Sequence, residues 1–316
     1  MTSAVVDQLD DLRPGLIGYC YRMLGSPFEA EDAVQETMVR AWQGANGFAG
    51  DASVRTWVYR IATNVCIDAL RGRGRRAVPM DLGPATAVAD VAEPLPSSQP
   101  WVTPMVGPLD PAEVVVGRET VRLAFIAALQ HLPARQRCVL ILRDVLAWPA
   151  ADVAALLDAT VGSVNSALQR ARATLSARPP QPSATELTER DQELLARYLD
   201  AFQRYDIETL VTLLHEDAIQ SMPPFPLWLS GRQEIGAFML GPGAECEGSR
   251  LIPTTANGSP AFWQYRAGDV PWSLQVLELR EGRIAEIHAF VLPALFEKFR
   301  PAPMSSGEAL RLDPVG

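Results

Sequence analysis

Arginine side chains gather at two places in the sequence, and their chemistry suits phosphate binding. Residues 55–76 hold six Arg against a single acid, Asp68, and residues 159–178 hold three Arg and no acid. Guanidinium groups bind phosphate oxygens through paired N–H donors and can also contact base edges. Affinity from counterion release grows with the number of phosphates neutralised, and both patches are small. We therefore expect two weak nucleic-acid contacts that need a larger partner to act together.

The elements that must position the first patch are two amphipathic helices. Ser26, Pro27 and Glu29 form a helix start, because Ser caps, Pro tolerates the first helical position and Glu can reach back to the cap. The helix is predicted to run to about Gln43. Its expected buried face comprises Ala30, Ala33, Val34, Met38, Ala41 and Trp42. The opposite face comprises Glu31, Asp32, Gln35, Glu36 and Arg40, and charge alone favours a solvated surface.

The second helix is predicted to run from Ser53 towards Gly72 and Gly74, which end it. Trp57 lies on its apolar stripe, so we interpret this residue as core. The expected buried stripe consists of Val54, Trp57, Val58, Ile61, Val65 and Ala69. Opposite or beside it lie Arg55, Tyr59, Arg60, Thr63, Asn64 and Arg71.

The second arginine patch belongs to a predicted helix-turn-helix within residues 112–177. After a short helix, a tight turn leads to Thr160, which is placed to cap the last helix. An ordinary helical hairpin is the alternative. Residues expected to face inward are Val161, Val164, Leu168 and Leu175, and those left outward are Ser163, Asn165, Ser166, Gln169, Arg170 and Arg172.

Residues 77–111 form a proline-rich, acidic connector between the two helical units. They contain eight Pro, four acids and neither Lys nor Arg. Proline removes backbone donors and fixes φ, so we expect this segment to stay extended and unpaired.

The remaining residues have the composition of an α+β domain, after a second proline-rich linker at 178–183. Two helical patterns precede five strand-like runs, at 218–222, 249–255, 261–266, 272–280 and 283–291. Glu281 and Gly282 separate the last two runs and indicate a hairpin turn. The available acid–base side chains are His215, Asp217 and His288.

Composition narrows the class of protein. The length of 316 residues predicts two or three compact units, and the net charge of -9 argues against a protein that coats nucleic acid indiscriminately. Neither a membrane span nor a signal peptide is predicted, so we expect a cytoplasmic protein. The four Cys are far apart, so neither a zinc site nor a disulfide framework is expected, and no cofactor is predicted.

Three segments carry a resemblance to bacterial extracytoplasmic-function (ECF) sigma factors of RNA polymerase. Residues 30–42 resemble their core-binding helix, and residues 53–70 resemble the part that melts and reads the minus-ten element. Residues 132–146 with 161–172 resemble the helix-turn-helix that reads the minus-35 element. The three matches follow in the family's order and cover residues 10–178.

The resemblance implies a role for each face. Core-polymerase contacts would come from Asp32, Gln35, Glu36 and Arg40, which replaces the solvated-surface interpretation. Minus-ten contacts would come from Arg55, Tyr59, Arg60, Asn64, Arg71, Arg73, Arg75 and Arg76. Minus-35 contacts would come from Ser163, Asn165, Ser166, Gln169, Arg170 and Arg172. The acidic connector would pass through the polymerase cleft, with a passive tether as the alternative.

Residues 184–300 resemble a SnoaL-type domain of the nuclear-transport-factor-2-like fold, a curved sheet against helices around a pocket. They lack the Asp-Gly-Gly-Gly-type motif of the best-described branch, and residues 222–228 occupy that region. We favour a regulatory clamp over catalysis or ligand binding, with the acidic domain resting on the basic surfaces. Possible pocket residues are Trp228, Phe238, Trp263, Tyr265, Trp272 and His288.

The predicted fold is thus multidomain: two all-α sigma domains, the second a helix-turn-helix, joined by a proline-rich linker, and a C-terminal α+β cone domain. Expected boundaries are 1–76, 77–111, 112–178 and 184–300, with a tail at 301–316. The expected partners are core RNA polymerase and promoter DNA, with a small-molecule ligand possible for the last domain. The alternative for the whole chain is a stand-alone helix-turn-helix regulator with a ligand-sensing domain, which would bind DNA tightly without polymerase.

Overall fold

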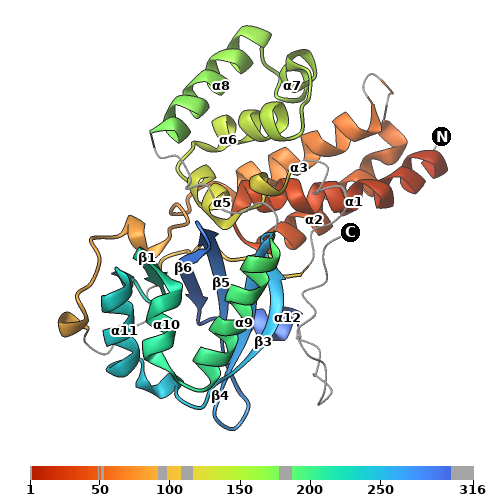
Figure 1. Ribbon diagram of the computed structural model, residues 1–316. Coiled ribbons are helices and arrows are strands. Elements are labelled where there is room, and N and C mark those ends of the chain that lie inside the picture. The colour runs from red at the N-terminus through yellow and green to blue at the C-terminus, as the bar shows by residue number, and fades with distance from the viewer. Residues whose placement is uncertain are drawn as a thin grey trace. The chain divides into compact units, whose positions relative to one another are not determined.

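The computed structural model in Figure 1 describes residues 2–48, 50, 53–91, 98–107, 117–177 and 187–299. The expected tail at 301–316 and the linker at 178–183 lie outside the described residues. The chain divides into two compact units. The first consists of residues 1–76, 102–105 and 109–181, and the second of residues 77–101, 106–108 and 182–316. No helix in the described ranges is long and apolar enough to cross a membrane.

The first unit begins with helices α1 (Thr2–Leu24), α2 (Pro27–Gly44) and α3 (Val54–Leu70). The predicted caps are present. The Ser26 hydroxyl accepts the Glu29 N–H at 3.5 Å, and the Ser53 hydroxyl accepts the Thr56 N–H at 3.0 Å. These bonds satisfy amides that have no partner within the helix, so both helices start where the sequence predicts.

The same unit continues with shorter helices. They are η4 (Arg118–Thr120), α5 (Leu123–Leu129), α6 (Ala134–Leu140), the π-helical turn η5 (Ile141–Val145), α7 (Ala150–Leu156) and α8 (Val161–Ser176). Between α7 and α8, Asp158 has φ 49°, a conformation that Asp tolerates in tight turns. The Thr160 hydroxyl then accepts the Ser163 N–H at 3.1 Å. The helix-turn-helix prediction is confirmed.

The two helical groups pack against each other, whereas the sequence predicted separate units. Arg137 of α6 is only 4% exposed and donates to the Met23 carbonyl oxygen and, at 2.7 Å, to Gln130 Oε1. Burial lowers the Arg137 pKa to about 10, which still leaves the guanidinium charged at neutral pH. The Tyr19 hydroxyl of α1 donates to Cys138 Sγ at 3.3 Å. A spaced hydrophobic pattern cannot show which helices share a core, and here α1 and α6 do.

The connector does not stay unpaired, which corrects the sequence prediction. It contains the 3-10 helices η2 (Pro79–Asp81) and η3 (Val88–Asp90), and residues 77–101 belong to the second unit. The Thr86 N–H donates to the Trp228 carbonyl oxygen at 2.9 Å, and the Trp228 indole N–H donates to the Gly83 carbonyl oxygen at 3.0 Å. Proline prevents regular pairing within this segment, but the remaining amides and carbonyls find partners on another element.

Two further contacts extend this association. The Val88 N–H donates to Glu234 Oε2 at 2.9 Å, and the Gly107 N–H donates to the Thr255 carbonyl oxygen at 2.8 Å. Val88 and Val91 also pack against the core of the second unit. Connector residues 92–97 and 108–111 lie outside the described residues.

The second unit is built on a six-stranded sheet with the order β2-β1-β6-β5-β4-β3. Neighbouring strands are antiparallel except for β1 and β6, which are parallel, so the predicted mostly antiparallel sheet is confirmed. Glu281 and Gly282 have φ 55° and 68°, the pair of positive values that a two-residue hairpin turn requires. The strands are β1 (Leu214–Ser221), β2 (Trp228–Ser230), β3 (Arg250–Ala256), β4 (Ser259–Arg266), β5 (Val270–Arg280) and β6 (Arg283–Phe290).

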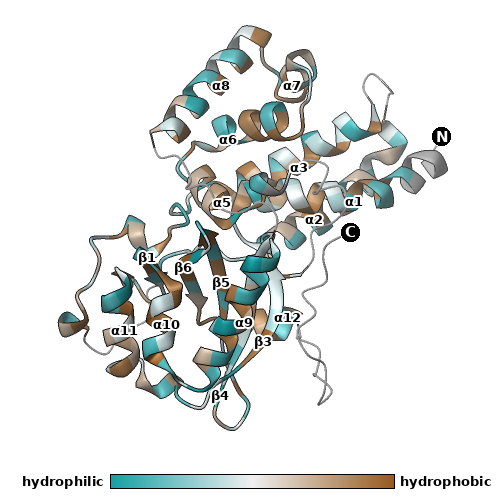
Figure 2. Ribbon diagram, viewed as in Figure 1, coloured by the Kyte–Doolittle hydropathy of each residue, from teal (hydrophilic) through white to brown (hydrophobic). Residues whose placement is uncertain are grey.

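Helices cover both faces of this sheet. One face packs against α9 (Glu189–Gln203), α10 (Ile207–Leu213) and α11 (Arg232–Leu240), followed by η6 (Ala244–Cys246). The other face is covered by α12 (Pro293–Phe299), where Phe296 stacks on Trp263 with ring centroids 4.6 Å apart. Figure 2 shows apolar colouring along much of β5, which suits a strand covered on both faces. The sequence missed the short β2 and α11.

Candidate nucleic-acid and polymerase interfaces

The outward face of α2 is exposed as predicted. Asp32, Gln35, Glu36 and Arg40 are all exposed, while Ala30, Ala33, Val34 and Ala41 are buried. The Arg40 Nε donates to Glu36 Oε1 at 2.7 Å, one helical turn apart. An exposed pair of this kind adds little to stability, so its charges remain available to a partner.

Two apolar side chains extend this face, and the sequence reading missed both. Trp42 is 67% exposed and Val39 is 49% exposed. Trp42 was predicted to be core, which is wrong, because the buried stripe of α2 ends at Ala41 and Ala45. The missed signal is spacing: Gln35, Val39 and Trp42 follow each other at intervals of four and three, which places them on one helical stripe.

On α3, the predicted minus-ten residues face the helix-turn-helix half of the first unit. Tyr59 is 2% exposed, and its ring lies 5.1 Å from the Trp148 ring between centroids. The Arg55 guanidinium lies over the same Trp148 ring at 5.1 Å. Arg60 donates to the Ala155 carbonyl oxygen of α7 at 2.7 Å. The predicted outward position of Tyr59 is therefore corrected, because α6 and α7 cover that side of α3.

Thr63 was also placed beside the outward face and is only 1% exposed. Its hydroxyl donates to the Tyr59 carbonyl oxygen at 2.7 Å and forms a second hydrogen bond with the Tyr19 hydroxyl, also at 2.7 Å. Asn64, by contrast, is exposed as predicted.

In the arginine cluster after α3, Arg71, Arg73 and Arg75 are exposed and Arg76 is half-buried, and the cluster is partly neutralised within the first unit. Arg73 and Arg76 each lie 2.7 Å from Glu29 Oε1, and Arg71 lies 2.9 Å from Asp68. Arg75 forms a 2.6 Å hydrogen bond with His131 Nδ1. Each of these contacts would have to compete with a phosphate for the same guanidinium.

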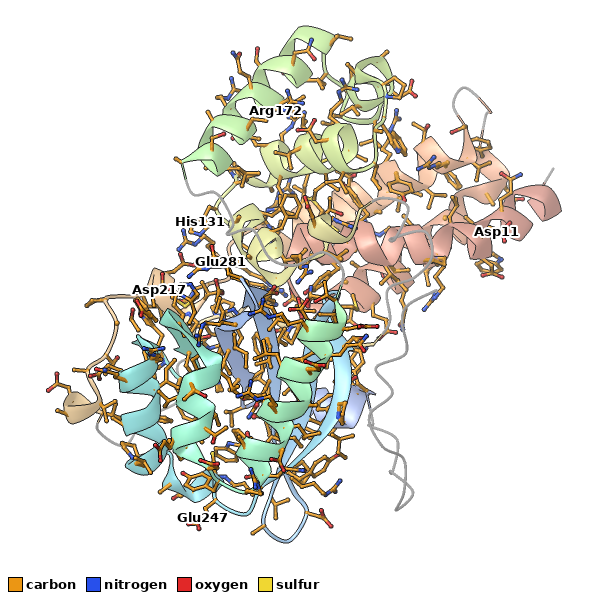
Figure 3. The ribbon with its side chains drawn as sticks, viewed as in Figure 1. Asp11, His131, Arg172, Asp217, Glu247 and Glu281 are labelled. Atoms are coloured by element: carbon orange, nitrogen blue, oxygen red, sulfur yellow. The ribbon has the colours of Figure 1, made fainter. Side chains whose placement is uncertain are left out.

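The outer face of α8 presents its polar residues together. Ser163, Asn165, Ser166, Gln169 and Arg170 are all exposed, and Figures 2 and 3 show polar colouring and side chains along this helix. Val161 was predicted to face inward, yet it is 43% exposed at the first turn.

Arg172 is held in place, unlike its neighbours. Its Nε and Nη2 donate to the two carboxylate oxygens of Asp144 at 2.8 and 2.6 Å. The hydrogen bond and charge of Asp144 raise the Arg172 pKa above its usual value. A guanidinium fixed by two bonds has one orientation relative to α8.

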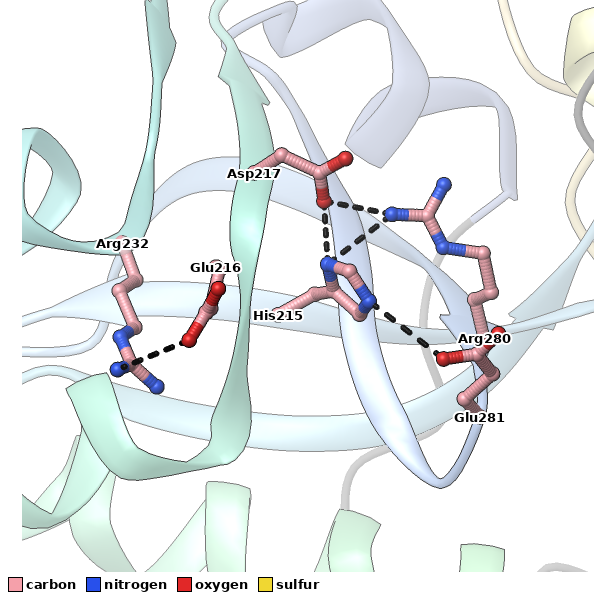
Figure 4. Close-up of polar contacts among 6 residues, drawn as sticks. All are labelled: His215, Glu216, Asp217, Arg232, Arg280 and Glu281. Atoms are coloured by element: carbon pink, nitrogen blue, oxygen red, sulfur yellow. Dashed lines mark hydrogen bonds and ion pairs between the residues drawn. The ribbon is translucent and has the colours of Figure 1, made fainter.

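Two polar clusters lie on the strands of the second unit. In Figure 4, Arg280 donates to Asp217 Oδ1 at 2.6 Å, and His215 lies between Asp217 and Glu281. Desolvation acts to raise the pKa of Asp217, but the His215 hydrogen bond and the Arg280 charge outweigh it and lower that pKa. Asp217 is itself 65% exposed in its side chain, so this cluster sits at the surface.

The second cluster is buried on the α12 side of the sheet. His288 Nδ1 is 2.8 Å from the Ser221 hydroxyl, and His288 Nε2 is 2.8 Å from Glu286 Oε2. Desolvation raises the Glu286 pKa, but the hydrogen bond and charge of His288 outweigh it, so the net pKa is lowered. The register of β1 and β6 explains why these three side chains meet. Ser221 pairs with His288, and alternate residues of a strand, such as Glu286 and His288, point to the same face of the sheet.

Only part of the predicted pocket lines a cavity. Phe238 and Trp272 line a cavity of about 30 Å³ that lies between the sheet and helices α9 to α11. Trp263 and Tyr265 instead pack on Phe296 across the sheet, and Trp228 binds the connector. Alternation along each strand decides which aromatic reaches the cavity, and the sequence did not indicate which face is inward. Within the described residues, no group of three or more His, Cys, Asp or Glu could hold a metal ion.

Comparisons with known proteins match three parts of the chain to protein families. Residues 9–76 match Sigma-70 region 2, residues 122–175 match Sigma-70 region 4, and residues 195–287 match the SnoaL-like domain. The chain is 46% identical over 302 residues to the ECF RNA polymerase sigma factor SigG of Mycobacterium tuberculosis, covering 91% of this chain and 81% of that protein.

Similarity also extends to SigJ of the same species. This relative is 29% identical over 218 residues, which cover 67% of this chain and 62% of that protein. The crystal structure of Mycobacterium tuberculosis extracytoplasmic function sigma factor SigJ shares the fold, with a TM-score of 0.64, 22% identity and coverage of 92% of this chain and 98% of that one. The chain has the two sigma regions in order and a SnoaL-like domain after them, and it is 46% identical to an ECF sigma factor over 91% of its length. It belongs to the family of ECF RNA polymerase sigma factors.

Proposed function

We propose that the chain binds core RNA polymerase through α2 and directs promoter-specific initiation through α3 and α8. The observation that carries this is the exposure of an acidic face on α2 and of a polar, arginine-bearing face on α8. Each falls on the segment whose family counterpart has that task. The proposed core-binding residues are Asp32, Gln35, Glu36 and Arg40, with Val39 and Trp42 completing the stripe.

For the minus-35 element, we propose that α8 enters the major groove. Ser163, Asn165, Ser166, Gln169 and Arg170 are free of the protein core on one face, as a groove-reading helix requires. A bidentate base contact contributes roughly 1 to 3 kcal/mol of discrimination. Arg172 is proposed to bind phosphate, because Asp144 fixes the orientation of its guanidinium.

For the minus-ten element, we propose that the contacts come from α3 and the following arginine cluster after a rearrangement. The Tyr59 ring packs on Trp148, and Arg60 donates to the Ala155 carbonyl oxygen. Both side chains of α3 are therefore in contact with residues of sigma region 4. An aromatic ring that stacks on an unpaired base must first be uncovered. The packed first unit is thus proposed as the polymerase-free state, and polymerase would separate the two regions. The proposed residues are Arg55, Tyr59, Arg60, Asn64, Arg71, Arg73, Arg75 and Arg76.

Run-off transcription with core polymerase on a promoter library tests this function. Reversing charge in the doublet Asp32→Arg/Glu36→Arg should abolish retention on core polymerase and transcription, because both carboxylates face outward on α2. The matched control is Glu193→Arg, an exposed acid on α9. Tight, promoter-specific binding by the purified chain without polymerase would favour the stand-alone regulator instead.

The SnoaL-like domain is proposed to regulate rather than catalyse. His215 and Asp217 are tied to Arg280 at the surface, and His288 is enclosed by Ser221 and Glu286. None of these groups is among the described residues that line the cavity. General acid–base catalysis needs such a group within reach of the substrate.

We propose that regulation acts through the connector. Residues 83–88 bind β2 and α11, so the domain restrains the segment that joins the two promoter-reading regions. Trp228→Ala removes the indole donor to Gly83, and it should change transcription without changing the affinity of α2 for polymerase. Trp263→Phe, a ring change on the opposite face of the sheet, is the control. Equal transcription by wild type and Trp228→Ala would refute this route.

A further inference from the structure

We propose that Val161 is a specificity-determining residue of α8, whose methyl groups contact the methyl group of a thymine in the minus-35 element. The inference rests on the proposed function, in which α8 enters the major groove. It adds an apolar residue to the polar face of that helix and names the base that this residue reads.

The first observation is an apolar side chain that the fold leaves outside. Val161 is 43% exposed in the first turn of α8, whereas Val164 and Leu168 of the same helix are 1% and 6% exposed. Valine also has a weaker helix propensity than Ala, Glu or Lys, because its branched side chain loses rotamer freedom in a helix. Neither the core nor the helix itself therefore accounts for a valine at this exposed position.

The second observation is where this side chain lies. Val161 is the first residue of α8, directly after the cap Thr160. In helix-turn-helix proteins, the N-terminal residues of the recognition helix contact the base edges. Gly162 is exposed, and in the described structure a Cβ placed on it would have one neighbour within 4 Å, the Thr160 hydroxyl at 3.9 Å. The described chain thus leaves this turn open for close approach to a duplex.

The chemistry of valine selects the base. Valine has no side-chain donor or acceptor, so Val161 cannot read the hydrogen-bonding groups of the base edges. The apolar group that a base edge presents in the major groove is the C5 methyl of thymine. Contact between the two removes apolar surface of both from water. Cytosine has a hydrogen atom in place of this methyl, so the contact distinguishes thymine from cytosine.

The neighbours of Val161 suit the same kind of base pair. Asn165 and Gln169 follow Val161 at intervals of four residues, which places the three side chains on one stripe of α8. Both amides are exposed, and an Asn or Gln side chain can bond N6 and N7 of adenine together. Four residues of a helix span about 6 Å, and base pairs stack at intervals of roughly 3.4 Å. The thymine that Val161 contacts should therefore lie within about two base pairs of the position that Asn165 contacts.

Replacing thymine with deoxyuridine tests the inference, because this change removes only the methyl group. Holoenzyme is assembled from core polymerase and the full-length chain, and its affinity is measured on a promoter selected from the run-off library. Each minus-35 thymine of either strand is replaced in turn. With the wild-type chain, one replacement should weaken binding about fourfold, the factor that corresponds to burial of one methyl group. The thymine at that place is the critical thymine.

Two variants locate the contact on α8. With Val161→Ala, promoters carrying thymine or deoxyuridine at the critical position should bind alike. Val270→Ala shortens a valine of β5 that is 53% exposed, and this control should keep the wild-type difference. Asn165→Ala should lose base discrimination within about two base pairs of the critical thymine. Thermal unfolding shows whether Val161→Ala folds, and the wild-type scan together with Asn165→Ala decides the matter if it does not.

Three results would overturn the inference. They are a wild-type chain that is indifferent to deoxyuridine at every minus-35 thymine, an undiminished difference with Val161→Ala, and an Asn165 position more than about two base pairs from the critical thymine. Specific promoter binding and transcription would leave the proposed function standing in each of these cases. A holoenzyme that binds no promoter of the library would refute the proposed function, and this inference with it.

Discussion

At the scale of single residues, an ion pair distinguishes two arginines of α8 that are both proposed to bind DNA. Arg172 is held by Asp144, while Arg170 projects from the exposed face of α8 without such an anchor in the described contacts. We expect the two arginines to differ in what they recognise: an anchored guanidinium suits a phosphate at a fixed place, and an unanchored one can follow a base edge.

Asp144→Asn tests this difference. It should weaken binding of polymerase holoenzyme to all minus-35 sequences alike, by a factor of about two to five, because the Arg172 guanidinium loses its fixed orientation and a surface ion pair has only a modest effect. Affinity is measured on promoters with single base changes in that element, and Asp152→Asn on the exposed face of α7 is the control. A change in base preference would contradict the phosphate assignment.

The ionisation of Glu286 should make the stability of the second unit depend on pH. Its folded pKa is lowered below the usual 4.5, chiefly because the bond and charge of His288 outweigh desolvation. Its ionised form therefore stabilises the fold above about pH 4.5, and this contribution is lost as pH falls through the lower folded value. The stability difference between wild type and Glu286→Gln should narrow on acidification. Urea unfolding at pH values from 7 down to about 2 measures this difference across the range in which the folded Glu286 is protonated. Exposed Glu216→Gln is the control, and a constant difference over the whole range would refute the assignment.

At the scale of elements, α2 shows how one helix can serve both core and partner. Ala30, Ala33 and Ala41 are small and buried, so α2 packs closely within the bundle. Its large apolar residue, Trp42, is left outside. Tryptophan is enriched among the few residues that dominate an interface, and its exposure here has no structural use within the unit.

Trp42→Ala should therefore cost affinity and not stability. We expect about a tenfold or greater loss of affinity for core polymerase, with an unchanged unfolding midpoint. Trp57→Ala is the matched control, since this half-buried ring packs on Phe48 at 5.1 Å between centroids and should lower the midpoint. Fluorescence titration and thermal unfolding give the two readouts. A large drop in the Trp42→Ala midpoint would show that this ring is structural.

At the scale of the molecule, the first unit buries part of its own promoter-reading surface. Trp148 is 6% exposed and touches Tyr59 and Arg55 from across the two sigma regions. If polymerase separates these regions, as we propose, the ring should become accessible. Hydroxyl-radical footprinting should find Trp148 protected in the free chain and oxidised in the complex with core polymerase. Trp263, buried against Phe296, should stay protected in both; continued protection of Trp148 would refute the rearrangement.

Local patterns in the sequence were sufficient for the elements that are specified by neighbouring residues. Helix starts at Ser26, Ser53 and Thr160 and the turn at Glu281 and Gly282 depend on hydrogen bonds and dihedral angles within a few residues. The polar faces of α2 and α8 follow from helical periodicity in the same way. The sigma and SnoaL-like assignments came from long matching segments and are confirmed by the comparisons.

Tertiary structure alone decided what covers each face. Tyr59 lies on the polar side of its own helix and is nevertheless buried, because α6 and α7 pack there. The connector forms hydrogen bonds with β2 and α11. Trp272 lines the cavity, whereas Trp263 packs on Phe296 of α12. These contacts join residues far apart in the chain, and periodicity carries no information about which distant element will meet a given face.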